Sequence, residues 1–118
     1  MAKVVTIPQS VFTDGTLVMN LEPPVSISGW TIRFELSKRL LSTTPFYQAY
    51  TASGYDGVSG ITVLNGPQAQ FKTNLPASVF SGIQQSGYDP VGPLALTWRR
   101  LDSGAQTLLA EGWLLSYP

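Results

Sequence analysis

The most regular hydrophobic pattern in the chain runs from Trp30 to Leu36, where apolar and polar residues alternate strictly. The apolar positions of this stretch are Trp30, Ile32, Phe34 and Leu36. An alternation of period two is typical of a β-strand with one buried face. Because this apolar face is the richest in the chain, and because Gly29 before it permits a tight turn, we expect the stretch to be the central core strand.

Seven further segments have an extended pattern, and turn residues such as Gly, Pro, Asn and Asp separate them. They cover residues 3–7, 16–21, 45–50, 61–64, 68–73, 94–101 and 106–117. The first is expected at the edge of a sheet, because Pro8 cannot donate a hydrogen bond to a ladder. Between residues 76 and 84, apolar residues recur at helical spacing after a proline, which predicts a short helical turn.

This succession of elements predicts an all-β fold, an immunoglobulin-like antiparallel β-sandwich of seven to eight strands with one short helical turn. A chain of 118 residues has the length of one domain, so we expect residues 1–118 to form a single sandwich. The chain contains no cysteine, so its stability must come from packing and backbone pairing rather than from a disulfide.

The charge balance argues against nucleic acid and membranes as partners. Seven Lys and Arg residues offset seven Asp and Glu residues, so no net charge attracts the chain to a polyanion. Arg99 and Arg100 are neighbours on a predicted strand and point to opposite faces, so they do not form one basic patch. No apolar run approaches the length of a membrane span, and the first residues lack the pattern of a signal peptide. We therefore expect a protein made in the cytoplasm.

The composition also disfavours enzymatic function. The chain has neither histidine nor cysteine, which removes the commonest general base, the usual metal ligands and the Ser-His and Cys-His nucleophile pairs. No Asp-x-Asp spacing offers a set of oxygen ligands for a hard cation. We predict no enzymatic activity, no catalytic residue, no metal site and no cofactor.

Three stretches carry a resemblance to a known family: residues 26–36 (SISGWTIRFEL), residues 59–63 (SGITV) and residues 111–115 (EGWLL). Together with a short helical turn before the penultimate strand, they follow the order found in small immunoglobulin-like domains of tailed-phage structural proteins. The chain resembles in particular the amino-terminal domain of baseplate upper proteins, and the resemblance spans most of its length.

The resemblance implies a non-enzymatic structural protein of a phage virion, in the tail or baseplate. Such a protein is made in the host cytoplasm and then becomes part of the virion. Its partners are other virion or tail proteins, and further copies of itself in a homo-oligomer. The low share of charged residues, 12% of the chain, is in keeping with a surface that is covered by assembly.

The last predicted strand has apolar residues on both of its faces. Leu109, Trp113 and Leu115 fall on the face opposite to Leu108, Ala110, Gly112 and Leu114. A Trp and Leu patch on a terminal strand is typical of the core of a protein interface. The alternative is that another part of the same domain covers the patch. We name Leu109, Trp113 and Leu115 as possible interface residues.

The tetrapeptide Ser-Gly-Tyr-Asp occurs twice, once ending in Tyr55 and Asp56 and once in Tyr88 and Asp89, both times in a predicted loop. An aromatic ring beside a carboxylate can stack on a sugar and hydrogen-bond to it. A carbohydrate- or surface-binding module that uses these loops is therefore the alternative function. The simpler interpretation is that both are ordinary turns with a packed tyrosine, since Gly, Ser and Asp are standard turn residues.

Overall fold

The structure, a computed structural model, describes residues 3–21, 25–38, 45–51, 58–102 and 107–118. Within these ranges the chain forms β1 (Lys3–Ser10), β2 (Gly15–Asn20), β3 (Ile32–Ser37), β4 (Tyr47–Tyr50), β5 (Val58–Ser59), β6 (Ile61–Asn65), β7 (Gln70–Leu75), α1 (Ser78–Gln85), β8 (Gly92–Arg100) and β9 (Thr107–Tyr117). The predicted short helical turn is confirmed as α1.

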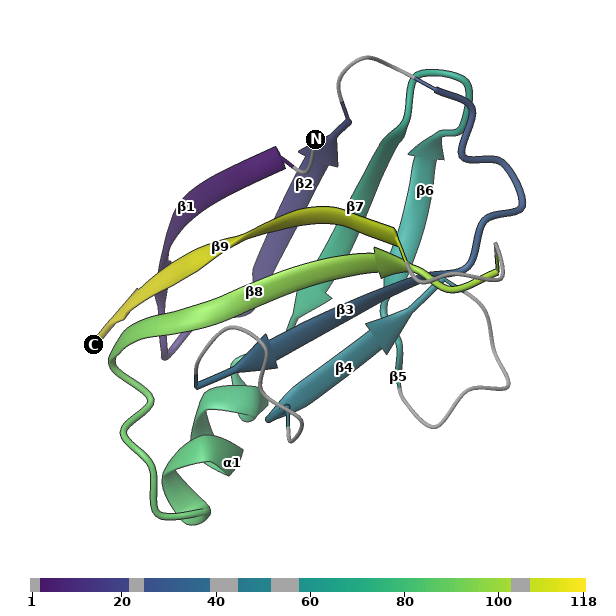
Figure 1. Cartoon of the computed structure of the whole chain (residues 1–118). Coiled ribbons are helices and arrows are strands. Elements are labelled where there is room, and N and C mark those ends of the chain that lie inside the picture. The colour runs from purple at the N-terminus through teal and green to yellow at the C-terminus, as the bar shows by residue number, and fades with distance from the viewer. Residues whose placement is uncertain (1–2, 22–24, 39–44, 52–57, 103–106) are drawn as a thin grey trace.

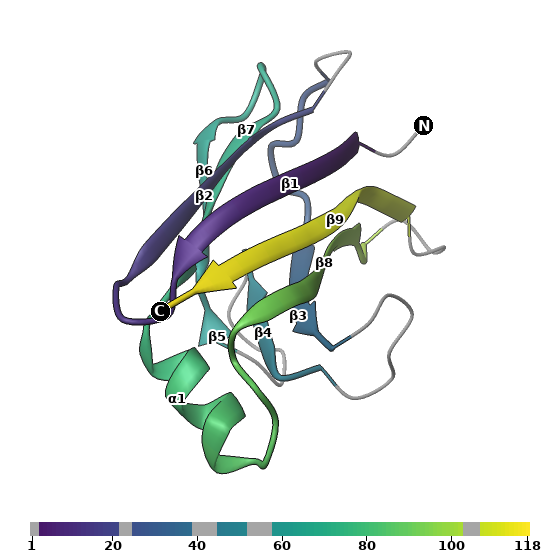
Figure 2. The same cartoon turned by 90° about the vertical axis from the view of Figure 1, so that its left-hand side faces the viewer.

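The strands form two sheets that face each other (Figure 1). The larger sheet has the order β1-β9-β8-β3-β4-β5 and the smaller has the order β2-β7-β6. The helix α1 lies across one end of the sandwich, and Figure 2 shows β1 closing one side of it, between β9 and β2. This arrangement is an immunoglobulin-like β-sandwich, as the sequence pattern predicts.

Two pairs of neighbouring strands are parallel, whereas the sequence predicted a sandwich of antiparallel strands. β1 pairs with β9 in the parallel sense, and so does β4 with the two-residue strand β5. β5 also raises the number of strands in the described ranges to nine, one above the expected range. β1 joins the larger sheet, whereas β2, only a short connection later, joins the smaller one.

Gly112 on β9 makes the close approach of β1 possible. A Cβ atom at this position would overlap the backbone carbonyl oxygen of Val5 on β1. Any residue other than glycine must therefore push β1 away from β9.

The core between the sheets is centred on β3 and its neighbours. Ile32, Phe34 and Leu36 on β3 are fully buried, and β3 lies between β8 and β4, so its predicted role as the central core strand is confirmed. The ring centroid of Phe34 lies 5.0 Å from that of Trp98 on β8. Phe80 and Ile83 of α1 close the core at the end that the helix covers.

Trp30 lies just outside the strand to which the sequence pattern assigned it. Gly29 has a φ of +80°, as the expected tight turn requires, but β3 begins only at Ile32. Trp30 is half-buried and packs at the margin of the core. Its ring centroid lies 3.9 Å from the guanidinium carbon of Arg100, which is a cation–π contact. Trp30 therefore lies outside β3, although its side chain still packs against the core.

Candidate interaction surface

The outer face of the larger sheet exposes a row of apolar side chains along β9. Residues with even numbers, from Ala110 to Ser116, point into the core and are buried. Trp113, Leu115 and Tyr117 point outward and are 37%, 45% and 51% exposed. Trp113 and Leu115 are therefore exposed within the domain, together with Tyr117, and their role in an interface stays a prediction.

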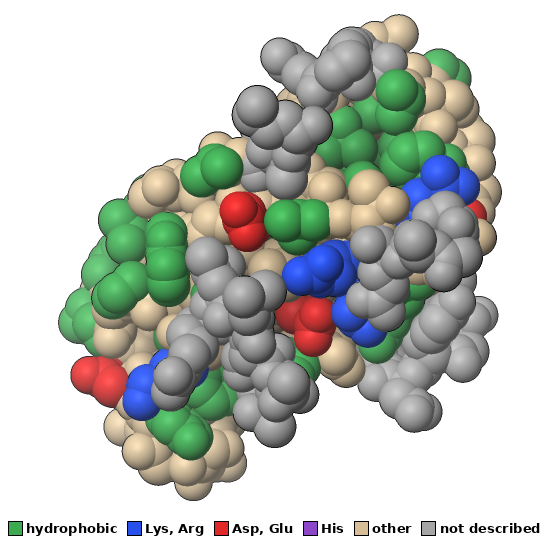
Figure 3. All heavy atoms as spheres, in the orientation of Figure 1, with side chains coloured by type: hydrophobic (Ala, Val, Ile, Leu, Met, Phe, Trp, Pro, Cys, Tyr) green, Lys and Arg blue, Asp and Glu red, His purple; other side chains and the backbone are tan. Residues whose placement is uncertain are grey.

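The neighbouring strands extend this apolar area. In the pairing register, Trp113 lies beside Ala95 on β8, and Leu115 lies between Pro93 on β8 and Pro8 on β1. Figure 3 shows a group of hydrophobic side chains at the end of the sheet where β9 ends. We call the exposed residues of this area the β9 patch: Pro8, Pro93, Trp113, Leu115 and Tyr117. None of them carries a charge.

Leu109 does not belong to the β9 patch, in contrast to the sequence-based expectation. The register between β8 and β9 shifts between Trp98 and Arg99, so Ala110 pairs with Trp98 and Leu108 with Arg99, and Leu109 falls at the irregularity. Leu109 is half-buried and packs against the hydrophobic core. A bulge changes the face of the sheet on which the side chains beyond it lie. A sequence pattern alone does not show where a bulge occurs.

The middle of the same face is polar and carries charges of both signs. The Arg33 Nε atom lies 3.2 Å from Glu35 Oε1, and both side chains are largely shielded, being 20% and 15% exposed. Gln48 donates a hydrogen bond of 3.2 Å to the second oxygen of Glu35. Glu111 and Arg99 are half-buried on this face, and neither has an ion-pair partner among the described residues.

Tyr88 and Asp89, one of the two predicted loop pairs, lie beside a hollow of about 190 Å³ that Lys38, Phe46 and Leu94 also line. Tyr88 is 45% exposed, but its ring packs edge-to-face on Phe46, with 5.2 Å between the centroids. The Lys38 ammonium lies 5.0 Å from the Tyr88 centroid. These contacts are those of a packed loop tyrosine, the simpler of the two interpretations of this sequence.

The Asp89 carboxylate accepts a hydrogen bond of 2.9 Å from the backbone N–H of Val91 and so shapes the turn into β8. The other predicted pair, Tyr55 and Asp56, lies outside the described residues. Carbohydrate binding by these loops stays a prediction.

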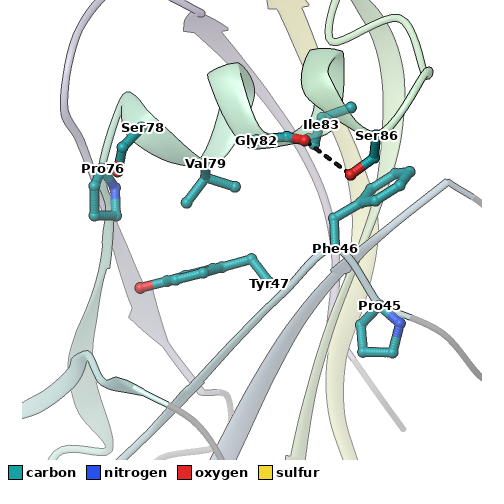
Figure 4. Close-up of a pocket in the computed structure, with 9 residues that line it drawn as sticks. All are labelled: Pro45, Phe46, Tyr47, Pro76, Ser78, Val79, Gly82, Ile83 and Ser86. Atoms are coloured by element: carbon teal, nitrogen blue, oxygen red, sulfur yellow. Dashed lines mark hydrogen bonds between the residues drawn. The ribbon is translucent and has the colours of Figure 1, made fainter.

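A second, larger cleft, of about 550 Å³, lies between α1 and β4 (Figure 4). The rings of Phe46 and Tyr47 form one wall, and Val79 and Gly82 of α1 form part of the other. The Tyr47 hydroxyl donates a hydrogen bond of 3.2 Å to the backbone carbonyl of Asn74, and burial raises the pKa of Tyr47. Sequence reasoning did not find this cleft, because it depends on where the helix packs.

The described part of the chain offers little for other kinds of site. It holds no group of three acidic side chains placed to bind a metal ion. Its helix, α1, has eight residues, and no helix in these ranges is long and apolar enough to cross a membrane.

Comparison with known proteins adds information on the fold. No protein-family profile matches the chain, and no curated protein sequence does either. Among solved structures, the chain is similar to one described as a marsupial T cell receptor, with a TM-score of 0.50 and 10% sequence identity. The match covers 95% of this chain and 48% of the receptor chain, so this chain spans about half of that protein's length. A likeness at this level of identity shows the fold alone, and that fold is the immunoglobulin-like β-sandwich.

Proposed function

We propose that this protein is a non-enzymatic structural protein that works by protein–protein contact, with the β9 patch as its contact surface. The observation that carries the proposal is the exposure of Trp113, Leu115 and Tyr117 along the same face of β9. Contiguous apolar areas of this kind are uncommon on monomeric proteins and mark places where another protein binds.

The composition of the patch supports a protein partner. Interface cores are rich in Trp and Tyr and poor in charged residues, and a few aromatic side chains supply most of the binding free energy. Trp113 and Tyr117 are such aromatic residues, and Leu115 lies between them on the same strand. Pro8 and Pro93 flank Leu115 and add rigid apolar area.

The resemblance to tailed-phage structural proteins suggests where in a virion such a protein would act. It supports a component of the phage tail or baseplate, located in the virion, whose partners are other virion or tail proteins and further copies of itself. Structural proteins of a particle need contact surfaces rather than catalytic groups, and the β9 patch is a surface of that kind.

The test compares Trp113→Glu with Val18→Glu. Val18 is 50% exposed on β2, in the other sheet, so it offers a matched apolar-to-charged change away from the patch. Sedimentation velocity measures self-association, and surface plasmon resonance measures binding to the virion proteins encoded by neighbouring genes. We expect Trp113→Glu to weaken association about tenfold or more and Val18→Glu to leave it unchanged.

Circular dichroism serves as the control for folding. Because Trp113 is on an exposed face, we expect Trp113→Glu to keep the wild-type spectrum. If association is the same in Trp113→Glu and in the wild type, or if the wild type associates with none of these proteins, the proposed function is wrong.

A further inference from the structure

The turn between β6 and β7 has the sequence Asn65-Gly66, and we propose that Asn65 is a site of spontaneous deamidation. The turn lies at the end of the sandwich opposite to α1 (Figure 1). In this reaction the backbone nitrogen of the next residue displaces the side-chain amide of an asparagine, which is one of the thermolabile residues of proteins. It requires an amide that water reaches, a backbone N–H that is free to lose its proton, and room for the nitrogen to approach.

Asn65 and Gly66 meet these three requirements. Asn65 is exposed. Within the described part of the chain, the Gly66 N–H has no hydrogen-bond acceptor, whereas the Gly66 carbonyl accepts two hydrogen bonds. A free N–H loses its proton more readily than one that is held in a ladder. Because Gly66 has no Cβ atom, no side chain on this residue hinders its nitrogen from approaching the Asn65 amide.

The turn also polarises the amide that is attacked. The backbone N–H of Gln68 donates a hydrogen bond of 3.3 Å to the Asn65 Oδ1 atom. This bond withdraws electrons from the carbonyl carbon, Cγ. When the nitrogen adds to Cγ, negative charge develops on Oδ1, and a donor that is already placed at this oxygen stabilises the charge, as an oxyanion hole does.

The reaction needs water as its only co-reactant. The Gly66 nitrogen loses its proton and forms a bond to the Asn65 Cγ atom, and the side-chain nitrogen takes up a proton and leaves as ammonia. Water then opens the resulting succinimide ring at either carbonyl group. The product is aspartate if the original backbone bond is kept, and isoaspartate if the chain continues through the former side chain. Both products add one negative charge, so the formal net charge of the chain changes from zero to −1.

Isoaspartate at this position disturbs a segment that the turn holds in place. The Ile27 N–H donates a hydrogen bond of 2.9 Å to the Gly66 carbonyl, and the Ile27 side chain is 0% exposed. Isoaspartate adds one carbon atom to the backbone between β6 and Gly66, which lengthens the chain by about 1.5 Å. The Gly66 carbonyl then moves relative to the Ile27 N–H, so deamidation loosens the chain around Ile27.

Peptide mass spectrometry after long incubation of the folded protein at mildly alkaline pH measures deamidation at each asparagine. Asn20 is the matched control within the same chain, because it is also exposed but is followed by Leu21. The Leu21 side chain hinders the approach of its nitrogen, and its N–H donates a hydrogen bond of 3.1 Å to the Ala69 carbonyl. We expect Asn65 to deamidate about tenfold faster than Asn20 or more. If Asn65 reacts no faster than Asn20, the inference is wrong.

Hydrogen exchange of the Ile27 amide tests the effect on the structure. The isoaspartate form is isolated by chromatography and compared with the wild type and with Asn65→Asp, which carries the same charge without the added backbone atom. We expect exchange about tenfold faster in the isoaspartate form and unchanged in Asn65→Asp. Equal exchange in all three proteins, or equally fast exchange in Asn65→Asp and the isoaspartate form, would refute the loosening of the chain around Ile27. This inference does not depend on the proposed function.

Discussion

The indole N–H of Trp98 on β8 donates a hydrogen bond of 2.9 Å to the hydroxyl of Thr73 on β7, so a buried polar contact joins the two sheets. Both residues are 0% exposed, and Phe34 packs against the Trp98 ring. Antibody domains join their sheets with a disulfide, but this chain contains no cysteine. The Trp98–Thr73 pair and the packing around it form a link between the sheets that does not depend on redox conditions.

We expect Thr73→Val to lower the free energy of unfolding by about 1–3 kcal/mol, because it leaves the buried indole N–H of Trp98 without an acceptor while keeping the volume of the side chain. Urea denaturation measures the change. Thr97→Val, on the outer face of β8, is the matched control and should change stability by less than about 0.5 kcal/mol. Equal losses at positions 73 and 97 would contradict a stabilising role for the inter-sheet hydrogen bond.

Phe34→Ala should lower the free energy of unfolding by about 3–5 kcal/mol, because it creates a cavity at the centre of the core. Trp30→Ala should cost less, because Trp30 is half-buried and its ring contact with Arg100 is worth about 0.5–1 kcal/mol at an exposed site. Thr31→Ala should cost least. Chemical denaturation of the three variants gives the order, and a larger loss for Trp30→Ala than for Phe34→Ala would be inconsistent with the position of Trp30 outside β3.

Gly112→Ala should release β1 from β9, since the added methyl group overlaps the Val5 carbonyl oxygen. We expect a loss of about 1–3 kcal/mol in the free energy of unfolding and faster hydrogen exchange of the β1 amides. Gly82→Ala in α1 is the matched control. Its new methyl group meets nothing within 4 Å, so it should raise stability by about 0.5–1 kcal/mol. Unchanged exchange in β1 of Gly112→Ala would show that β1 does not depend on this close approach.

Asp102 should make stability depend on pH in the acidic range. Hydrogen bonds from the Arg100 side chain and from the Thr31 backbone N–H hold the pKa of Asp102 at about 2, below its ordinary value of 3.8. A depressed pKa in the folded state means that the carboxylate stabilises the fold above about pH 4, and that this contribution is lost as the pH falls toward 2. The stability difference between the wild type and Asp102→Asn should be constant above about pH 5 and shrink below pH 4. A difference that does not vary between pH 5 and pH 2 would disagree with this assignment.

Local patterns in the sequence determined most of the secondary structure. The alternation at Ile32, Phe34 and Leu36 was sufficient to identify a strand and its buried face, because the direction of a side chain on a strand depends only on the parity of its position. The helical spacing of Phe80 and Ile83 identified α1 and its buried side for the same kind of reason. The alternation along β9 placed Trp113 and Leu115 on the face opposite to Ala110, Gly112 and Leu114, and the structure shows that theirs is the exposed face.

Only the tertiary structure decided which strands pair and where the alternation stops. The parallel pairing of β1 with β9 joins residues at opposite ends of the chain, and no local pattern in β1 specifies its partner. The turn at Gly29 removes Trp30 from β3, and the bulge near Arg99 turns Leu109 toward the core. The β9 patch likewise depends on neighbours from β1 and β8. These features result from contacts between distant segments, whose free energy depends on the packing of the whole sandwich rather than on the residues next to them in sequence.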